Sequence, residues 1–362
     1  MLAAWEVSAT MPFPLLLQSY NRHKFKTLCI DGRQPGVTLS IMTVHGGAAE
    51  RMVGNSAQGG SRIAVIGGGL IGTSWSALFL AYGHEVALYE PVEDARAGLA
   101  DKIAQLSAQI GELEQNLPAP GRLRLVPSLE EAVGGANWIQ ENAPEKVPLK
   151  RELYAVVEAN APQGTTIASS TSSLVWSELS AEMADPSRLI TAHPFNPPHL
   201  MPLVELYGSD PERIQAAAAF FRGLGRHPVF LKREAVGHIA NRLSSALWRE
   251  AVNMVAEGIA EVEDIDAALV YGPGLRWSVV GSHMAYHLGG GPGGIGHYLA
   301  HLGPSQERRW LDLGSPKLDQ ATQAKLVAGI AAAAQGRNIA ELEAARDAGL
   351  IAAQQALRGR RP

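Results

Sequence analysis

The chain has 362 residues but only one cysteine, Cys29, so it can form neither an internal disulfide bond nor a cysteine-based metal site. One cysteine near the N-terminus fits a protein of the reducing cytoplasm. The net charge is −4, which argues against nucleic acid or an anionic membrane as the main partner, because both require a basic surface. No apolar run approaches the roughly 18 residues that span a bilayer. The length and the 46% of hydrophobic residues are instead typical of a soluble protein with two domains.

The first 60 residues differ in composition from the rest. The segment "MPFPLLLQSY" (11–20) is apolar, but it lacks the basic region and the small-residue cleavage site of a signal peptide. Further methionines and the polar run "GNSAQGGS" (54–61) follow it. We therefore expect residues 1–60 to be a flexible extension that results from a start codon placed too far upstream. A targeting arm is the alternative.

Strand-like and helix-like segments alternate between residues 61 and 232. The first pair is "RIAVI" (62–66), a run typical of a buried parallel strand, and "TSWSALFLAYG" (73–83), a helix that ends at a glycine. This alternation predicts a Rossmann-type α/β domain with a doubly wound, mainly parallel sheet. From residue 233 to 362 the strand signals stop. Segments such as "GHIANRLSSALWREAVNMVAEGIA" (237–260) predict an all-α C-terminal domain there.

Three glycines after the first strand form a GxGxxG pattern that leads into the first helix. Such a turn is tight, allows the backbone to approach a pyrophosphate, and directs a helix N-terminus at its negative charge. Glu90 ends the next strand, where a carboxylate binds the ribose hydroxyls of NAD and repels the 2′-phosphate of NADP. We therefore expect NAD. FAD, or a glycine turn without a ligand, are the alternatives. The residues expected to contact NAD in this turn are Gly67, Gly69, Leu70, Ile71 and Gly72.

The stretch "AHPFNPPHLMPLVELY" (192–207) places four prolines within nine positions around polar side chains. His193 follows a strand of the sheet, and a neutral imidazole there suits a base that removes a hydroxyl proton. Glu205, on the next strand-like run, would accept from the second ring nitrogen and stabilise the imidazolium. A lone histidine is more often an ordinary buried residue. Ser172 after a strand and Asn241 at the start of the helical domain favour the catalytic interpretation, and we expect the prolines to hold Asn196 across the cleft.

Taken together, five motifs resemble the L-3-hydroxyacyl-CoA dehydrogenase superfamily over residues 62–320. They are "VIGGGLIG", "ENAPEKVPLK", "SSTSSL", "HPFNPPHLMPLVEL" and "VGHIANRL". The resemblance implies a Rossmann domain over 61–232 and a 6-phosphogluconate-dehydrogenase-like helical domain over 233–362 through which two chains form a homodimer. By this resemblance, His193 matches the family's catalytic base and Glu205 the carboxylate partner of that base. Ser172 and Asn241 match the two groups that hold the substrate oxygen. Glu145 and Lys150 match two residues near the nicotinamide ribose.

Two departures from the family pattern bear on the substrate. "VGH" (236–238) stands where the family usually has "PGF", and the acyl-CoA segment "YPMGPF" is absent. Its place is taken by "GPGLRWSVVGSHMAYHLGGG" (272–291), which resembles the branch that contains the L-carnitine and, more distantly, the L-gulonate 3-dehydrogenases. Within that resemblance Arg276 would bind a substrate carboxylate, and Trp277, Tyr286 and Phe195 would face a quaternary ammonium. An ordinary salt bridge for Arg276 and core packing for the aromatic rings are the alternatives.

The sequence therefore predicts a cytoplasmic, NAD-dependent dehydrogenase that converts a small 3-hydroxy acid to its 3-oxo acid. A carnitine-like acid fits best, and a gulonate-like acid or a hydroxyacyl-CoA thioester are the alternatives. A non-catalytic, crystallin-like role is remote, because a structural protein has no need for the whole polar set. We expect no metal ion, since His283 and His287 have no carboxylate near them in the sequence. We expect no nucleic acid or membrane partner either.

Overall fold

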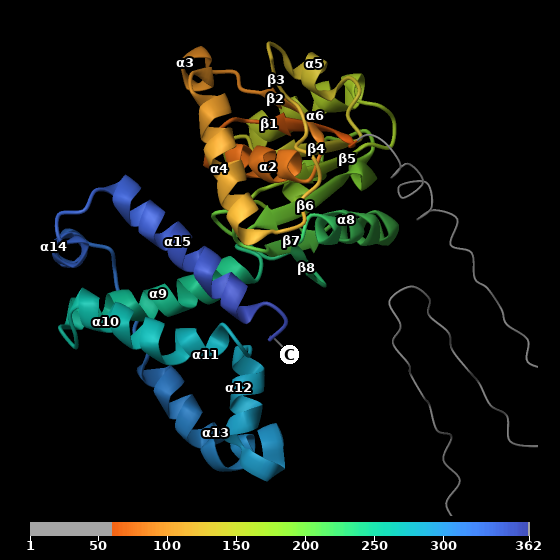
Figure 1. The fold of residues 1–362 in the computed structure, drawn as a ribbon. Helices are drawn as coiled ribbons and strands as arrows, with labels where there is room; N and C mark the ends of the chain where they lie inside the picture. The colour runs from red at the N-terminus through yellow and green to blue at the C-terminus, as the bar shows by residue number, and fades with distance from the viewer. Residues whose placement is uncertain (1–59, 361–362) are drawn as a thin grey trace, which may run out of the picture. The chain divides into compact units, whose positions relative to one another are not determined.

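The computed structural model describes residues 60–360 of the chain, so the expected extension lies outside them except for its last residue. A single eight-stranded sheet comes first and is followed by helices only (Figure 1). The strand order is β3-β2-β1-β4-β5-β6-β7-β8, and every neighbouring pair is parallel except β6 and β7. The predicted fold class is thereby confirmed. The strands are β1 (Arg62–Ile66), β2 (Glu85–Tyr89), β3 (Leu123–Val126), β4 (Trp138–Glu141), β5 (Thr166–Ser169), β6 (Leu189–Pro194), β7 (Leu203–Tyr207) and β8 (His227–Phe230).

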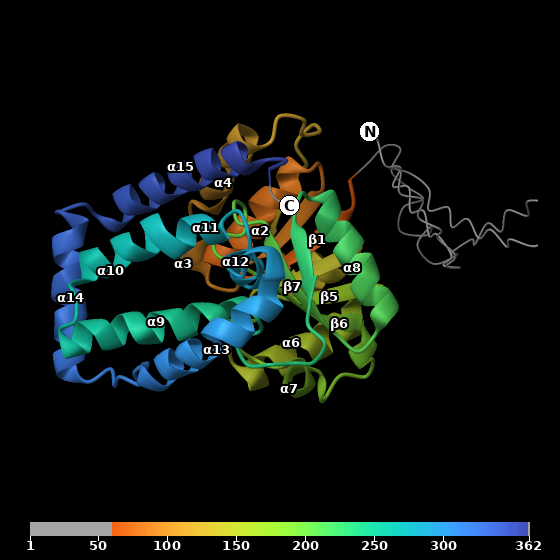
Figure 2. The same cartoon turned by 90° about the horizontal axis from the view of Figure 1, so that it is seen from below.

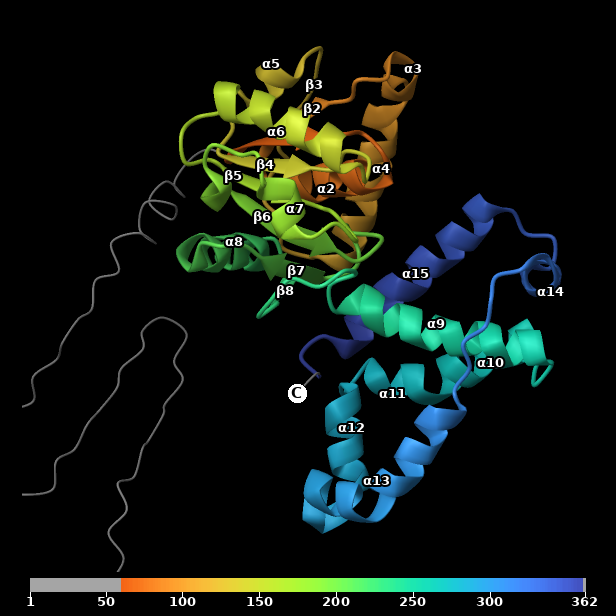
Figure 3. The ribbon, with the colours of Figure 1, turned by 180° about the vertical axis from the view of Figure 1, so that it is seen from behind.

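Helices cover both faces of the sheet (Figures 1 and 3). One apolar cluster joins the strands to α2, α4 and α8, and it contains Trp75 stacked on Phe79 and tilted against Phe221. A second cluster joins the other face to α5, α6 and α7. Each large side chain buried in this way stabilises the fold by roughly 1.5–3 kcal/mol. These helices are α2 (Leu70–Ala81), α3 (Glu93–Arg96), α4 (Leu99–Leu113), α5 (Leu129–Val133), α6 (Val147–Asn160), α7 (Trp176–Ser180) and α8 (Pro211–Gly223).

The C-terminal part is built from helices that leave the sheet and return to it. Helices α12 and α13 extend away from the sheet and pack mainly against each other (Figures 1 and 3). Helix α15 returns and lies alongside α4 (Figure 2). There Gln354 and Arg358 donate to the main-chain oxygens of Leu200 and Leu113. These helices are α9 (Ala240–Glu257), α10 (Val262–Leu269), α11 (Leu275–Trp277), α12 (Ser282–Gly289), α13 (Gly294–Asp312), α14 (Gln320–Ala334) and α15 (Ile339–Leu357). Of the helices in residues 60–360, none has the length and apolarity needed to cross a membrane.

Candidate active site

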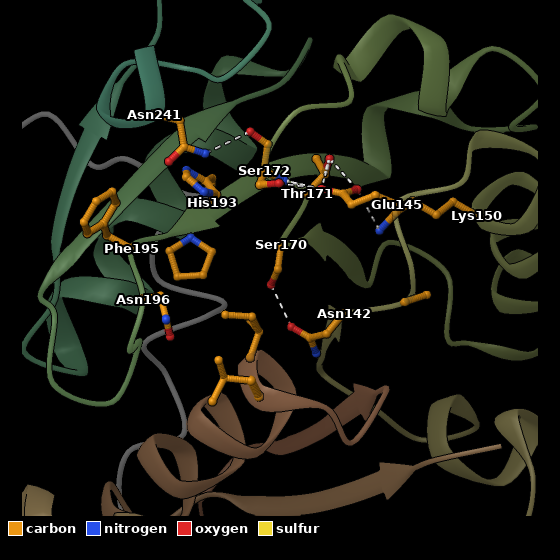
Figure 4. A pocket seen from close by; sticks show the side chains of 14 residues that line it. Asn142, Glu145, Lys150, Ser170, Thr171, Ser172, His193, Phe195, Asn196 and Asn241 are labelled. Carbon is orange, nitrogen blue, oxygen red and sulfur yellow. Dashed lines mark hydrogen bonds and ion pairs between the residues drawn. The ribbon is translucent and has the colours of Figure 1, made fainter. Parts of the chain in front are cut away.

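A cleft of about 420 Å³ opens at the carboxyl ends of β1, β4, β5 and β6. This is the edge where parallel α/β sheets bind ligands, next to the point between β1 and β4 where the strand order reverses. Figure 4 shows His193 and Asn241 on one side of the cleft and Glu145 and Lys150 on the other. The lining residues are Leu70, Ile71, Asn142, Ala143, Glu145, Lys150, Ser170, Thr171, Ser172, His193, Pro194, Phe195, Asn196 and Asn241.

The glycine turn between β1 and α2 has the geometry that a dinucleotide requires. Gly67 has a φ of 91°, and a Cβ on it would lie 2.8 Å from the main-chain oxygen of Asn142. A Cβ on Gly72 would lie 1.8 Å from the oxygen of Gly67, so the helix can approach the strand only without a side chain there. Gly69, the residue that caps α2, faces open space and provides no side-chain cap. The N-terminus of α2 is therefore open to an anionic group.

Glu90 directly follows β2 and faces this turn. Its carboxylate accepts hydrogen bonds from the backbone N–H groups of Gly68 (2.7 Å) and Val92 (2.9 Å). A carboxylate has about four lone-pair positions, so acceptor capacity remains for two ribose hydroxyls. The glycines, the open helix N-terminus and Glu90 together fit the pyrophosphate and the adenosine ribose of NAD.

The wall on the β4 side rests on a buried carboxylate that sequence reasoning missed. Glu141 is fully buried and accepts hydrogen bonds of 2.6 Å from Lys150, Tyr154 and Ser169. Burial, together with the adjacent Glu141 carboxylate, raises the pKa of Tyr154 well above its usual value, so the phenol stays protonated and donates. Lys150 is thus fixed in place by an ion pair that water does not reach.

Glu145 joins this wall to the turn after β5. It accepts hydrogen bonds from the hydroxyls of Thr171 and Ser172, both at 2.9 Å, and from the backbone N–H of Ser172. Partial burial acts to raise the pKa of Glu145, but these bonds and the Lys150 ammonium 3.7 Å away outweigh burial and lower it. The Ser172 hydroxyl is thereby oriented by a residue that lines the same cleft.

His193 and Glu205 are direct cross-strand partners in the antiparallel pair β6–β7. The Nδ1 atom of His193 lies 2.7 Å from Oε2 of Glu205, which is fully buried. The other carboxylate oxygen, Oε1, accepts from the backbone N–H groups of Ile239 (2.7 Å) and Ala240 (3.0 Å), where α9 begins. Burial acts to raise the pKa of Glu205, but the bonds from His193, Ala240 and Ile239 outweigh it and lower the pKa.

His193 differs slightly in position from the expectation, because it lies within β6 and not beyond its end. The first proline of the stretch, Pro194, still belongs to the strand, and the chain turns only after it. Phe195 and Asn196 lie in this turn and line the cleft (Figure 4). Asn241, at the start of α9, donates to the main-chain oxygen of Ser172 at 3.2 Å.

The structure does not bring Arg276 and Trp277 to the cleft. Both lie on α11 and are exposed, and neither lines the cleft. Helix α9 carries the chain away from the sheet, and α10 and α11 run back from its far end (Figures 1 and 2), but no residue of α11 is among those that line the cleft. Tyr286 on α12 packs against Tyr298 of α13, with ring centroids 5.0 Å apart. In residues 60–360 no three His, Cys, Asp or Glu side chains are grouped as metal ligands.

Asn142, Ser170 and Thr171 also line the cleft and were not singled out from the sequence. Ser170 donates to the side chain of Asn142 at 2.7 Å, which in turn donates to main-chain oxygens of β1 and β4. The signal was present, because Asn142 directly follows β4, and Ser170 and Thr171 are the first two residues after β5. Polar residues at that edge of a parallel sheet are candidates for ligand contact.

Two family models cover most of the described chain. The 3-hydroxyacyl-CoA dehydrogenase NAD-binding domain matches residues 62–235, and the C-terminal domain of the same family matches residues 237–323. The chain belongs to the 3-hydroxyacyl-CoA dehydrogenase family. It is therefore an NAD-dependent oxidoreductase, and the open helix N-terminus and Glu90 are the features of its structure that suit NAD.

Individual relatives agree with the family. An L-carnitine dehydrogenase of Streptomyces griseus is 47% identical over 297 residues, which cover 80% of this chain and 88% of that protein. An L-carnitine dehydrogenase of Pseudomonas aeruginosa is 42% identical over 302 residues, which cover 82% and 93%. Among solved structures, the NAD⁺-dependent dismutase 5-formyl-3-hydroxy-2-methylpyridine 4-carboxylic acid 5-dehydrogenase is 26% identical. It superimposes with a TM-score of 0.71 over 82% of this chain and 98% of that one.

Proposed function

We propose that this chain oxidises the 3-hydroxyl group of a small 3-hydroxy acid to a ketone with NAD as the acceptor, and that L-carnitine is the favoured substrate. The observation that carries the proposal is the 47% identity to an L-carnitine dehydrogenase over 80% of the chain. The pairing of His193 with Glu205 at the edge of a dinucleotide cleft supports the same reaction type.

His193 is the proposed base. Because the Glu205 carboxylate can only accept, the imidazole proton stands on Nδ1, and Nε2 has a lone pair available to substrate. As the hydroxyl proton moves to Nε2, the hydrogen on the carbinol carbon leaves with its electron pair and the C–O bond becomes a C=O bond. The nicotinamide ring of bound NAD supplies the acceptor for that hydride. The resulting imidazolium is stabilised by the carboxylate 2.7 Å away.

Hydroxyl and amide groups around the base are proposed to hold the substrate. Ser172 and Asn241 line the cleft beside His193 and would hydrogen-bond the reacting oxygen. Phe195 presents a ring that would face a quaternary ammonium, and Asn196 adds an amide. Lys150 is the cation among the residues that line the cleft, and its ammonium is already paired with Glu141. In the described chain a substrate carboxylate would therefore meet neutral amide and hydroxyl donors.

The test is NADH formation by the purified protein with L-carnitine, L-gulonate, L-3-hydroxybutyrate and 3-hydroxybutyryl-CoA. We expect the highest kcat/KM with L-carnitine. Turnover of the thioester alone would overturn the assignment to free acids, and turnover of none of the four would favour a non-catalytic role. His193→Ala is expected to leave NAD binding nearly intact and to lower kcat by orders of magnitude. His227→Ala, at an exposed histidine of β8, is the matched control.

We also propose that two copies of the chain form a homodimer through their C-terminal helices. Residues 242–249 of α9 are exposed without a break, and they include Leu243 at 66% and Trp248 at 54% exposure. On α13, Trp310 and Leu311 are exposed as well. Apolar side chains exposed in such numbers are typical of an association surface. Light scattering should give the mass of a dimer, and Leu243→Glu is expected to shift it toward that of one chain.

A further inference from the structure

His238 is a buried histidine beside the proposed base, and it has no part in the reaction described above. Its side chain is only 3% exposed, and its ring centroid lies 5.0 Å from that of His193. Its Nε2 atom lies 3.0 Å from the main-chain oxygen of Thr171. A carbonyl oxygen can only accept, so Nε2 carries a proton and donates it. The sequence has this histidine where the family pattern has the phenylalanine of "PGF".

The backbone at His238 is strained, which indicates that its contacts hold it in place. Its φ is 50°, a left-handed conformation that costs a residue with a Cβ roughly 1–2 kcal/mol. The residues after it tie the start of α9 to the site, since Ile239 and Ala240 donate to Glu205 and Asn241 donates to Ser172. The segment 238–241 thus connects the turn after β5 to both members of the His–Glu pair.

Burial, more than the charges around it, makes protonation of His238 unfavourable. Burial lowers the pKa of His238, and a proton on His193 lowers it further. The bond to Thr171 and the carboxylates of Glu205 and Glu145 act in the opposite direction but do not prevail. His238 therefore stays neutral at neutral pH. A second cation next to His193 would oppose the imidazolium that forms when the base takes its proton.

We propose that His238 is a positioning residue of this site. It packs against the ring of His193 and donates Nε2–H to Thr171, and so it holds the turn that presents Ser172 while adding no charge beside the base. The inference rests on the proposed function, because it assigns a role relative to His193 as the base. It also predicts a difference from family members that have phenylalanine at this position.

Two substitutions separate the ring from the hydrogen bond. His238→Phe keeps an aromatic ring against His193 and removes the donor to Thr171. His238→Gln removes the ring and places an amide N–H near the former Nε2. Losing one buried hydrogen bond corresponds to about a tenfold loss in kcat/KM, and we expect that loss in His238→Phe. In His238→Gln, which restores a donor, we expect kcat/KM within about threefold of the value for the unaltered protein. NAD affinity should stay the same in both variants.

The pH profile supplies a readout that a merely structural role would not change. In the unaltered protein, the fall of kcat/KM at low pH should be steeper by one proton than in either His238 variant, because the site works with His238 neutral and the variants have no group to protonate at this position. His199→Gln, at another buried histidine that lies outside the cleft, is the control and should keep the steeper slope. Unchanged kcat/KM and slope in His238→Phe would overturn the proposal.

If the unaltered protein oxidises none of the four hydroxy acids, the proposed function fails and the His238 contact is tested without turnover. NMR of the imidazole nitrogens at neutral pH should then show His238 as the neutral tautomer with a hydrogen-bonded Nε2–H. The signals of His193 should move in His238→Phe and not in His199→Gln. A protonated His238, or His193 signals unaffected by His238→Phe, would overturn the inference.

Discussion

Glu205→Gln is the substitution that tests the proposed mechanism most directly. The glutamine can point its amide oxygen at Ile239 and Ala240, as Oε1 of the carboxylate does now. Its NH₂ group then faces Nδ1 of His193, which must accept, so the ring proton moves to Nε2. A protonated Nε2 cannot take a proton from the substrate.

The opposite amide orientation keeps the productive tautomer, and its cost sets the size of the effect. The NH₂ group would then face the two backbone N–H groups at the start of α9, which are left without an acceptor. Each buried donor without a partner costs about 1–3 kcal/mol, or about 2–6 kcal/mol for both. At about 1.4 kcal/mol per factor of ten, the productive fraction falls by about 30-fold to about 10⁴-fold. We therefore expect kcat to fall on the order of 10³-fold, somewhat less than the roughly 10⁴-fold loss known for one inverted histidine tautomer.

The assay is steady-state NADH formation with L-carnitine, together with NADH binding followed by fluorescence. Binding should be unchanged, since Glu205 lies behind His193 and does not line the cleft. The matched control is Glu234→Gln, a carboxylate that also accepts a backbone N–H but binds Ser177 outside the cleft. A loss of less than tenfold in Glu205→Gln would refute the role of Glu205 in setting the tautomer.

Two further predictions concern stability and cofactor choice. Burial lowers the pKa of His199 from 6.5 to about 4. In the neutral ring, Nε2–H donates to the amide oxygen of Gln109 and Nδ1 accepts from the hydroxyl of Ser74. Between pH 6.5 and about 4 the unfolded chain therefore binds more protons at His199 than the folded chain does. The free energy of unfolding is unaffected by this group above pH 6.5, and it decreases by about 3 kcal/mol as the pH falls toward 4. Urea unfolding across this pH range should show that the free energy of unfolding depends less on pH in His199→Gln than in the unaltered protein. The same pH dependence in both proteins would contradict the role given to His199. Glu90→Ala removes the carboxylate proposed to bind the ribose, so the preference for NAD over NADP should fall about tenfold or more. Kd values for both dinucleotides test this, and an unchanged ratio would exclude Glu90 as the selective group.

Features that depend on neighbouring residues were predictable from the sequence. The strand, turn and helix from Arg62 to Ala81 are contiguous, so the alternation and the glycine spacing were enough to place the dinucleotide turn. His193 and Glu205 are twelve positions apart on adjacent strands, and their pairing depends on one connection. Periodicity and short loops describe such local relations well.

The tertiary structure decided the relations between distant segments. Nothing near Glu205 in the sequence indicates that the start of α9, 34 and 35 positions later, would bind its second oxygen. Likewise the pattern at 272–291 suggested a substrate contact for Arg276, but the path of the chain through α9, α10 and α11 leaves this side chain outside the lining of the cleft. The physical reason is that the packing of helices depends on the whole apolar surface that they bury against one another. A short motif specifies only its own residue types, so it does not determine where the helix that contains it will lie.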